Sequence, residues 1–466
     1  MSTQTFPLRV AKALDDPALQ TALRTMSGHL RTRRAAAFES LPDADTIRDH
    51  ARHAKLDTLR DLASNLETFE ARVIANGGVV HWAETAADAN QIVVDIARHH
   101  AVQRVAKGKS MVSEETHLND ALAAAGLSVV ETDLGEYIVQ LAGDRPSHIV
   151  APIIHLSRAE VGRVMHQHLH TPLTDDPVTL GGYARERLRH VFLEADMGLT
   201  GANFGVVETG TICLVTNEGN GRMVSGLPRV HVVLMGIEKL IPTLADLDRF
   251  LKVLPRSATG QKLTAYTTLI HGPRRPDDDC GPQALHVVLI DNGRTRLMAS
   301  ESAEILGCIR CGACMNVCPV YTSIGGHAYG DTYPGPVGAV VTPGLRGLHE
   351  WADLPSASSL CGACRDVCPV RLDIPRMLLA LRAQAAPWQA PAWLNAAMRA
   401  FAAVVTRPAA YRLANRVMRL ALRRRAREGW VTHVPGPAAA WTTSRDLPAP
   451  AAKTFQELWR ERSSTS

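Results

Sequence analysis

The sequence predicts a parallel-sheet α/β domain followed by a smaller α-helical domain built around clustered cysteines. Short β-rich runs alternate with helical stretches from about residue 76 to about residue 300. Such alternation is typical of a parallel sheet with helices on both faces. Seven of the nine cysteines then fall between residues 308 and 368, which indicates a separate unit with its own chemistry. A chain of 466 residues is long enough for two or three domains.

The residues before the predicted sheet are expected to be helical. They carry many charges, and Leu56, Leu59, Leu62 and Leu66 recur at helical spacing. In the α/β domain, the first expected elements are a strand at 79–82, a helix at 87–99, a strand at 103–106 and a helix at 114–124. Later strands are expected at 204–207, 211–216, 230–235 and 285–290. An active face is expected where parallel strands end, at their carboxyl edge.

The clustered cysteines have the spacing of an iron–sulfur protein. The first run is C-x2-C-x2-C-x3-C-P, and it consists of Cys308, Cys311, Cys314 and Cys318 followed by Pro319. The second run repeats this pattern with Ser358 in the first position, and its cysteines are Cys361, Cys364 and Cys368. In two-cluster ferredoxins the cysteine before proline binds the other cluster. This crossover predicts one site of Cys308, Cys311, Cys314 and Cys368, and a second of Cys318, Cys361 and Cys364.

The second site therefore lacks one thiolate, and its fourth ligand stays open. The simplest expectation is two [4Fe-4S] clusters, with Ser358, His327 or a partner's residue completing the second one. A [3Fe-4S] cluster at that site is the alternative. Zinc is the main competing metal because C-x2-C pairs are common in zinc sites, but a zinc ribbon uses two cysteines in each half. A disulfide framework is disfavoured because the chain is long and shows no secretory signal.

Composition and charge exclude several classes of protein. Hydrophobic residues make up 46% and charged residues 21%, as in ordinary globular chains, and the net charge of +5 is too small to indicate nucleic-acid binding. No segment approaches the ~20 apolar residues of a membrane span, so a cytoplasmic protein is expected. Nine arginines and no acidic residue lie between Arg399 and Arg427. This segment could contact an acidic partner or a membrane surface, or it could be an ordinary solvated helix.

Two turns in the α/β domain could bind a small anion. Lys107-Gly108-Lys109-Ser110 ends like a P-loop, but Gln103 stands where the earlier glycine is required. Gly219-Asn220-Gly221 begins like a dinucleotide fingerprint, but Val224 occupies the third glycine position. We therefore expect neither an ATP site nor a nicotinamide site. Backbone amides and lysine charge could still hold an anion at either turn, and an ordinary strand-to-helix turn is the structural alternative.

Two further segments have a functional and a structural interpretation. Polar residues and glycines surround the expected strand at 212–215. This arrangement suits a pocket for a small anion or a hydroxy acid, and the structural alternative is a hairpin that turns at 217–220. His166, His168 and His170 could bind a metal, or they could be solvated histidines near the end of a helix.

Motifs along nearly the whole chain resemble those of the lactate utilization protein B family, a family of iron–sulfur proteins. The matching segments are 107–115, 216–220, 308–321, 325–330, 333–340 and 358–364, and the last 80 residues are the least distinctive. The resemblance implies an α/β domain of the LUD type, similar to sugar-isomerase and CoA-transferase folds. It also implies that Ser358 is a family feature and that the two ligand sets are those given above. The implied regions are a helical region (1–75), the LUD-type domain (76–300), a ferredoxin-type domain (301–385) and an Arg/Ala-rich helical region with a tail (386–466).

The resemblance also implies a function, the oxidation of L-lactate to pyruvate together with two partner subunits. Since no flavin or nicotinamide fingerprint is present, we expect an electron-transfer subunit that passes electrons singly through its clusters. A sharper hypothesis is that iron at the three-thiolate site binds the 2-hydroxy acid, with Lys109 or Arg310 offsetting the carboxylate charge. Another 2-hydroxy acid such as glycolate, or a redox-sensing or scaffold protein, are the alternatives.

Overall fold

The computed structural model describes residues 5–463 and divides into two units, one ending at Ala385 and one beginning at Ala386. The first unit opens with four helices, α1 (Phe6–Leu14), α2 (Pro17–Glu39), α3 (Ala44–Arg60) and α4 (Leu62–Ala75). The leucines with helical spacing lie on α3 and α4, and Leu59, Leu62 and Leu66 are buried there. Among the described residues, no helix combines the length and apolar character needed to span a membrane.

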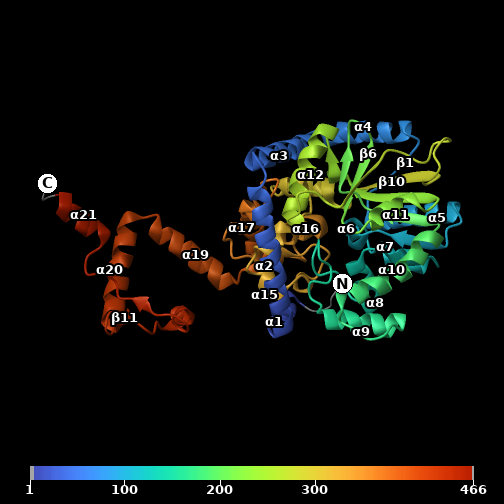
Figure 1. Ribbon diagram of the computed structural model, residues 1–466. Helices are drawn as coiled ribbons and strands as arrows, with labels where there is room; N and C mark the ends of the chain where they lie inside the picture. The colour runs from blue at the N-terminus through green and yellow to red at the C-terminus, as the bar shows by residue number, and fades with distance from the viewer. Residues whose placement is uncertain (1–4, 464–466) are drawn as a thin grey trace. The chain divides into compact units, whose positions relative to one another are not determined.

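A six-stranded parallel sheet forms the centre of the α/β part (Figure 1). In spatial order its strands are β1 (Val79–Ala83), β10 (Ala284–Ile290), β7 (Val230–Gly236), β4 (Met197–Thr200), β2 (Arg104–Lys107) and β3 (Ser128–Glu131). Each neighbouring pair is parallel, which confirms the predicted fold class. Two of these strands, β3 and β4, were not expected from the sequence, although β2, which has the same length, was.

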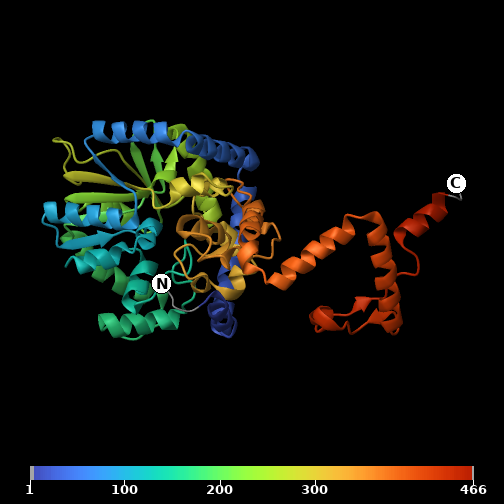
Figure 2. The ribbon, with the colours of Figure 1, turned by 180° about the vertical axis from the view of Figure 1, so that it is seen from behind.

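Helices cover both faces of this sheet, as the alternating pattern predicted. On one face, apolar residues of α5 (Ala86–His99) and α7 (Leu118–Ala124) form a core with the strands. On the other face, α4 lies over one part of the sheet (Figure 2), and α8 (Leu134–Ala142), α10 (Pro177–Glu194) and α11 (Asn220–Gly226) cover another part. The helix expected at 114–124 is divided into α6 (Met111–Glu115) and α7, because His117 adopts a left-handed conformation between them.

A second sheet of four strands corrects one expectation. Its order is β8 (Leu240–Ile241), β5 (Phe204–Val206), β6 (Thr211–Thr216) and β9 (Tyr266–Ile270). The strands expected at 204–207 and 211–216 exist, but their assignment to the parallel sheet is wrong. They pair antiparallel with each other, because the four residues that join them are too few for a parallel crossover. Gly210, at φ 69°, occupies this tight connection.

The remaining elements of the α/β part connect these strands. They are α9 (Arg158–Leu169), η1 (Ile237–Lys239), α12 (Leu244–Ala258) and α13 (Arg294–Met298). His166 and His168 lie near the C-terminus of α9 and His170 follows it, and all three are exposed to solvent. The prediction of solvated histidines at a helix end is therefore confirmed.

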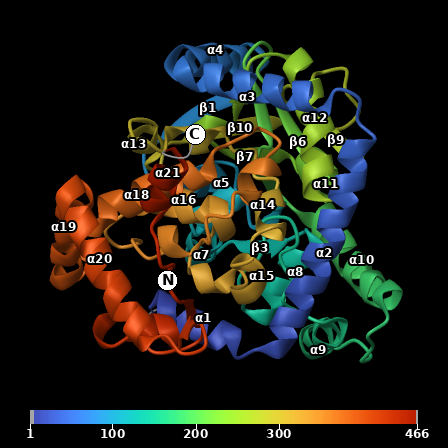
Figure 3. The ribbon, with the colours of Figure 1, turned by 90° about the vertical axis from the view of Figure 1, so that its left-hand side faces the viewer.

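The cysteine-bearing part is helical and packs against the N-terminal helices. Its elements are η2 (Ala303–Gly307), α14 (Ala313–Asn316), α15 (Tyr321–Ile324), η3 (His327–Tyr329), α16 (Gly335–Arg346), η4 (Leu354–Ser356), α17 (Ala363–Asp366) and α18 (Ile374–Gln389). α2 lies alongside α14 and α15, and α3 contacts η2 (Figure 3). One apolar core joins residues of all these segments, and α16 is buried along most of its length.

The second unit consists of two longer helices and short elements. These are α19 (Ala392–Val405), α20 (Pro408–Arg425), β11 (Trp430–Val431), η5 (Gly436–Thr442), β12 (Leu447–Pro448) and α21 (Phe455–Ser463). Within the described residues, α19 and α20 have no buried side chain. Apolar side chains such as Trp393, Phe401 and Val417 are therefore exposed on these helices, beside the arginines noted in the sequence.

Candidate metal centre and adjoining cavity

The two cysteine loops have the same local backbone conformation. In the first loop, Arg310 and Gly312 adopt left-handed conformations with φ of 58° and 75°. In the second loop, Leu360 and Gly362 do the same, with φ of 56° and 86°. A short helix follows each glycine directly, α14 after the first and α17 after the second. The sequence repeat is therefore also a structural repeat, and the glycines are required at its second left-handed position.

Ser358 occupies the position that Cys308 has in the first loop. The Arg310 amide donates a hydrogen bond to the Cys308 sulfur at 3.4 Å. The Leu360 amide donates to the Ser358 hydroxyl oxygen at 3.1 Å in the corresponding contact. The serine oxygen is thus held where the first loop holds a thiol.

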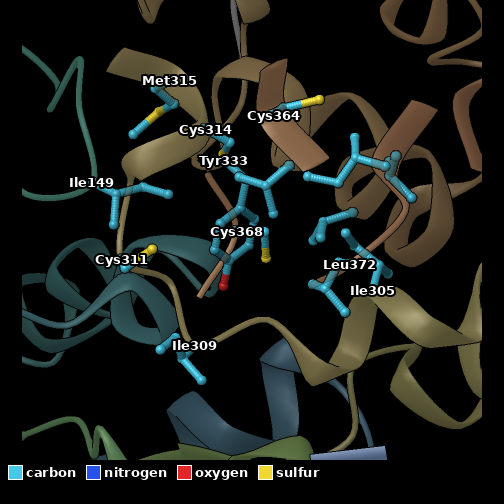
Figure 4. Packing of buried hydrophobic residues seen from close by; sticks show 14 of the residues in the cluster. Ile149, Ile305, Ile309, Cys311, Cys314, Met315, Tyr333, Cys364, Cys368 and Leu372 are labelled. Carbon is cyan, nitrogen blue, oxygen red and sulfur yellow. The ribbon is translucent and has the colours of Figure 1, made fainter. Parts of the chain in front are cut away.

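Four cysteines of the first predicted site lie together in the apolar core. Cys311, Cys314 and Cys368 are buried (Figure 4). The half-buried Cys308 packs against the same core. Burial, followed by the neighbouring Cys308 and Cys368 thiols, raises the pKa of Cys311. Burial and the Cys308 thiol likewise raise the pKa of Cys314. Cys311, Cys364 and Cys368 add to the effect on Cys314, so thiols of both predicted sites lie near it.

The other three cysteines, those of the second predicted site, include one at the surface. Cys318 and Cys364 are buried, whereas Cys361 is exposed. Burial, with Cys318 as the next largest cause, raises the pKa of Cys364 to about 12. Burial raises the pKa of Cys318 as well, and Cys361 adds to this effect. The proximity of Cys314 to Cys364 connects the two groups.

These donors fit iron–sulfur clusters. One group offers four sulfurs and the other offers three sulfurs beside a serine oxygen, and thiolates are the ligands that such clusters use. The surrounding apolar core contains Met315, Tyr333 and Leu372 (Figure 4). The role of the cysteines as ligands, and their division into two clusters, stays a prediction from the cysteine spacing.

Two arginines from the N-terminal helices bind the second cysteine-proline turn. Arg34 on α2 donates to the carbonyl oxygen of Val367 at 2.6 Å. Arg48 on α3 donates to the carbonyl oxygens of Asp366 at 2.7 Å and Cys368 at 2.8 Å. Both guanidinium groups place positive charge beside residues expected to carry negative thiolates. Sequence reasoning missed them, because more than 300 residues separate each arginine from its partner.

A buried ionic network joins the α/β part to the first cysteine loop. Arg294 contacts the carboxylates of Glu115 at 2.9 Å and Glu238 at 2.5 Å, and all three side chains are at most 2% exposed. The Tyr333 hydroxyl donates to Glu115 at 2.6 Å. Arg310 lies 3.6 Å from Glu238 and stacks over the Tyr333 ring at 4.8 Å. Although burial opposes ionisation, Arg294 and Arg310 lower the pKa of Glu238 to about 2.

A cavity of about 290 Å³ lies beside this loop, at the carboxyl ends of three parallel strands. Lys109 follows β2, Asp133 follows β3, and Gly201 follows β4. The wall is completed by residues 214–218 with Asn220 and Gly221, by Lys239, and by Ile309, Arg310 and Cys311. The cavity thus brings together the two turns that sequence analysis singled out for anion binding, and it places both beside a predicted cluster ligand.

The structure refines the interpretation of both turns. Lys107 is fully buried and ion-paired with Glu131 at 2.5 Å, so Lys109 is the lysine of this turn that lines the cavity, together with Gly108 and Ser110. The hairpin interpretation of residues 217–220 is wrong, because Gly219 caps the N-terminus of α11 and the chain continues as a helix. Among the described residues, the cavity that contains Lys109 and Arg310 includes Cys311 but none of Cys318, Cys361, Cys364 and Ser358. These two cations therefore lie next to the four-thiolate group and not next to the three-thiolate group.

His327 lies in a different cavity of about 580 Å³. Its Nε2 is 2.7 Å from the carbonyl oxygen of Arg145, and its ring lies 4.6 Å from that of His155. His155 in turn bonds Asp144 at 2.9 Å and the Ser147 hydroxyl at 2.7 Å. One ring nitrogen of His327, a candidate fourth ligand of the second cysteine site, is thus hydrogen-bonded to the loop at 144–155.

The regions and motifs described above match known protein families. Residues 66–290 match the model of the LUD domain, residues 304–372 match that of the 4Fe-4S dicluster domain, and residues 384–464 match that of the lactate utilisation protein B C-terminal region. The cysteine-bearing part is therefore similar to iron–sulfur domains, in agreement with the motif spacing.

Curated relatives match the chain from end to end. Lactate utilization protein B of Bacillus velezensis is 40% identical over 99% of this chain and 98% of its own length. Two proteins of the same name are equally similar. That of Oceanobacillus iheyensis is 40% identical over 97% of this chain and 95% of its own length. That of Geobacillus kaustophilus is 41% identical over 98% of this chain and 97% of its own length. A crystal structure of a DUF162 family protein from Deinococcus radiodurans covers 49% of this chain and 98% of its own, at 16% identity and a TM-score of 0.27. The full-length matches show that this chain belongs to the lactate utilization protein B family.

Proposed function

We propose that this chain is the iron–sulfur electron-transfer subunit of a complex that oxidises L-lactate to pyruvate with two partner subunits. The observation that carries the proposal is the repeat of two cysteine loops with the same backbone conformation, six of whose seven cysteines lie in or against one apolar core. The names of the full-length relatives support lactate as the substrate.

The first set, Cys308, Cys311, Cys314 and Cys368, would hold one [4Fe-4S] cluster. The second set, Cys318, Cys361 and Cys364, would hold another, with the Ser358 oxygen at the fourth position or with a [3Fe-4S] cluster instead. Bound there, each cluster would take up and release one electron at a time, which suits the stepwise removal of the two electrons of lactate. Arg34 and Arg48, which donate hydrogen bonds to carbonyl oxygens of the second Cys-Pro turn, would offset the negative charge of the thiolates electrostatically.

The two sets differ in access. The first lies in the core next to the cavity, while the exposed Cys361 brings the second to the surface. A redox partner can therefore approach the second set without any rearrangement of the core. This difference supports an electron path in which the interior set receives electrons from the substrate and the surface set passes them to a redox partner.

Low-temperature EPR on the anaerobically purified complex, with both partners co-expressed, tests the function. Cluster signals should appear after L-lactate is added and should not appear with 2-methyllactate, which lacks the C2 hydrogen. Cys361→Ser should remove the second signal and lower the iron content, whereas Cys280→Ser, at an exposed cysteine outside both sets, should change neither. Clusters that respond to dithionite but never to lactate would contradict lactate oxidation. Zinc in place of iron would contradict the cluster assignment itself.

A further inference from the structure

We propose that the cavity beside Cys311 binds the carboxylate of a small 2-hydroxy or 2-oxo acid through Arg310, Lys109 and Lys239. This inference rests on the proposed function, and it adds that this chain, and not only a partner, holds the substrate. The cavity is defined by residues of the α/β part and of the first cysteine loop together.

Arg310 is the main indication of a ligand. Its side chain is only 6% exposed, yet its Nη1 has no hydrogen-bond acceptor among the described residues. A buried donor without a partner is costly, so a missing acceptor is expected at this point. Glu238 at 3.6 Å and the Tyr333 ring hold the guanidinium in place from its other sides. The planar donor fork of arginine matches a carboxylate in particular.

Two lysines add positive charge from separate elements. Lys109, after β2, donates one hydrogen bond to the carbonyl oxygen of Val150 at 3.1 Å, and an ammonium group has three donors to offer. Lys239 lines the same cavity from η1 and is 9% exposed. Three cationic side chains thus line one cavity, and their combined charge attracts an anion.

The wall also contains two acidic residues, Asp133 and Glu218, and the N-terminus of α8 engages both of them. Asp133 accepts hydrogen bonds from the amides of Gly135 at 3.0 Å and Glu136 at 3.2 Å. Glu218 accepts from the amide of Leu134 at 3.1 Å. Burial, and then the Asp133 carboxylate, raises the pKa of Glu218. Glu218 therefore supplies a carboxyl group with a reduced tendency to carry charge, which suits a hydrogen bond to a hydroxyl or keto oxygen.

The size and place of the cavity favour a small acid. At about 290 Å³ it lies at the lower end of the range for ligand pockets, which excludes a dinucleotide. Because Arg310 directly precedes Cys311, a carboxylate bound to its guanidinium would lie beside the four-cysteine set. The surface set is not part of this cavity among the described residues.

Isothermal titration calorimetry with pyruvate on the anaerobic complex tests the site. Lys109→Met should raise the Kd for pyruvate about 10- to 100-fold, since a charge-assisted hydrogen bond is lost. Lys252→Met is the matched control, because this exposed lysine pairs with Asp248 on α12, and it should leave the Kd unchanged. Iron content and the dithionite-reduced EPR spectrum should be unchanged in both variants, which separates binding from cluster assembly. Arg310→Met, judged by the same readouts, is the second variant.

The outcomes separate this inference from the proposed function. Weaker pyruvate binding in Lys109→Met, with intact clusters, supports the site even if lactate fails to reduce the protein. If lactate reduces the clusters but both Lys109→Met and Arg310→Met bind pyruvate normally, the substrate lies in a partner and the inference is overturned while the function stands. An affinity for pyruvate no greater than that for inorganic phosphate would overturn the assignment to a carboxylic acid.

Discussion

The buried Arg294 should be one of the most sensitive positions of the first unit. Arg294→Met removes the cation between Glu115 and Glu238 but retains a flexible apolar side chain of similar length. Both carboxylates then stay buried, at 2% and 1% exposure, without their main partner. Glu238 would keep only Arg310, at 3.6 Å, and the strength of that contact decides how much charge is left uncompensated.

The expected cost follows from burial. Removing one partner of a buried ion pair costs about 3–5 kcal/mol, because the remaining charge is left unpaired. A typical domain has only about 5–15 kcal/mol of stability, so this loss is a large fraction of it. With about 2 °C of melting temperature per kcal/mol for a large domain, the variant should melt about 6–10 °C lower.

A surface pair of the same chemistry provides the control. Arg60 and Asp57 lie 2.7 Å apart on α3, but their side chains are 75% and 58% exposed. Arg60→Met should therefore cost less than about 1 kcal/mol, since exposed pairs contribute little. Both variants are compared with the unmodified chain by calorimetry under anaerobic conditions at one scan rate, because unfolding of a cofactor protein is rarely reversible. Iron content is measured on the same samples.

A double variant makes the reasoning stricter. Adding Glu115→Gln to Arg294→Met removes one of the two stranded carboxylates, so the double variant should melt higher than Arg294→Met alone. A melting temperature of Arg294→Met within about 2 °C of Arg60→Met would refute the view that this network stabilises the junction between the α/β part and the cysteine loop. A double variant that melts lower than the single one would refute the electrostatic cause.

Three further predictions follow from other features. Ser358→Cys should complete the second set, since the serine oxygen already has the place of a thiol; iron content and the EPR line shape of the isolated protein should change, and identical spectra would exclude this position as a ligand. Gly326→Ala should prevent normal folding, because a Cβ would lie 1.8 Å from the Ser147 carbonyl oxygen. Gly181 on α10 is the control, because a Cβ there would meet open space. In a thermal melt, Gly181→Ala should be neutral or stabilise the protein by about 0.5–1 kcal/mol. Burial lowers the pKa of His231 to about 3. Between about pH 6.5 and pH 3 the unfolded chain therefore binds more protons than the folded chain, and the free energy of unfolding should fall by up to about 1.4 kcal/mol per pH unit. His231→Gln should flatten the acid-unfolding curve measured by circular dichroism, and an unchanged curve would contradict the burial argument.

The predictable part of this molecule is local in sequence. The cysteine spacing, the position of Ser358 and the parallel sheet follow from patterns within a few tens of residues, and the structure has the loops and strands in that form. Lys109 was singled out because the turn at 107–110 ends like a P-loop, and the structure places this lysine on the cavity wall. The short strands β3 and β4 escaped detection, although β2, of the same four-residue length, was predicted.

The unpredicted part depends on contacts between distant residues. Nothing near Arg310 in sequence indicates that Glu238 and Tyr333 hold it, or that Lys239 faces the same cavity. The antiparallel arrangement of β5 and β6 was missed because strand pairing depends on the connection and not on the strands themselves. Partners that lie hundreds of residues away leave no local signal, which is why the cavity emerged only with the fold.

The hydrogen bonds of Arg34 and Arg48 bear on how the protein is made. The first of these arginines is synthesised 333 residues before its partner Val367, a delay of roughly 20–60 s at ordinary rates of translation. During that time α2 and α3 have no cysteine turn to close upon. The contacts between these helices and the turn therefore form late, long after the helices themselves have left the ribosome.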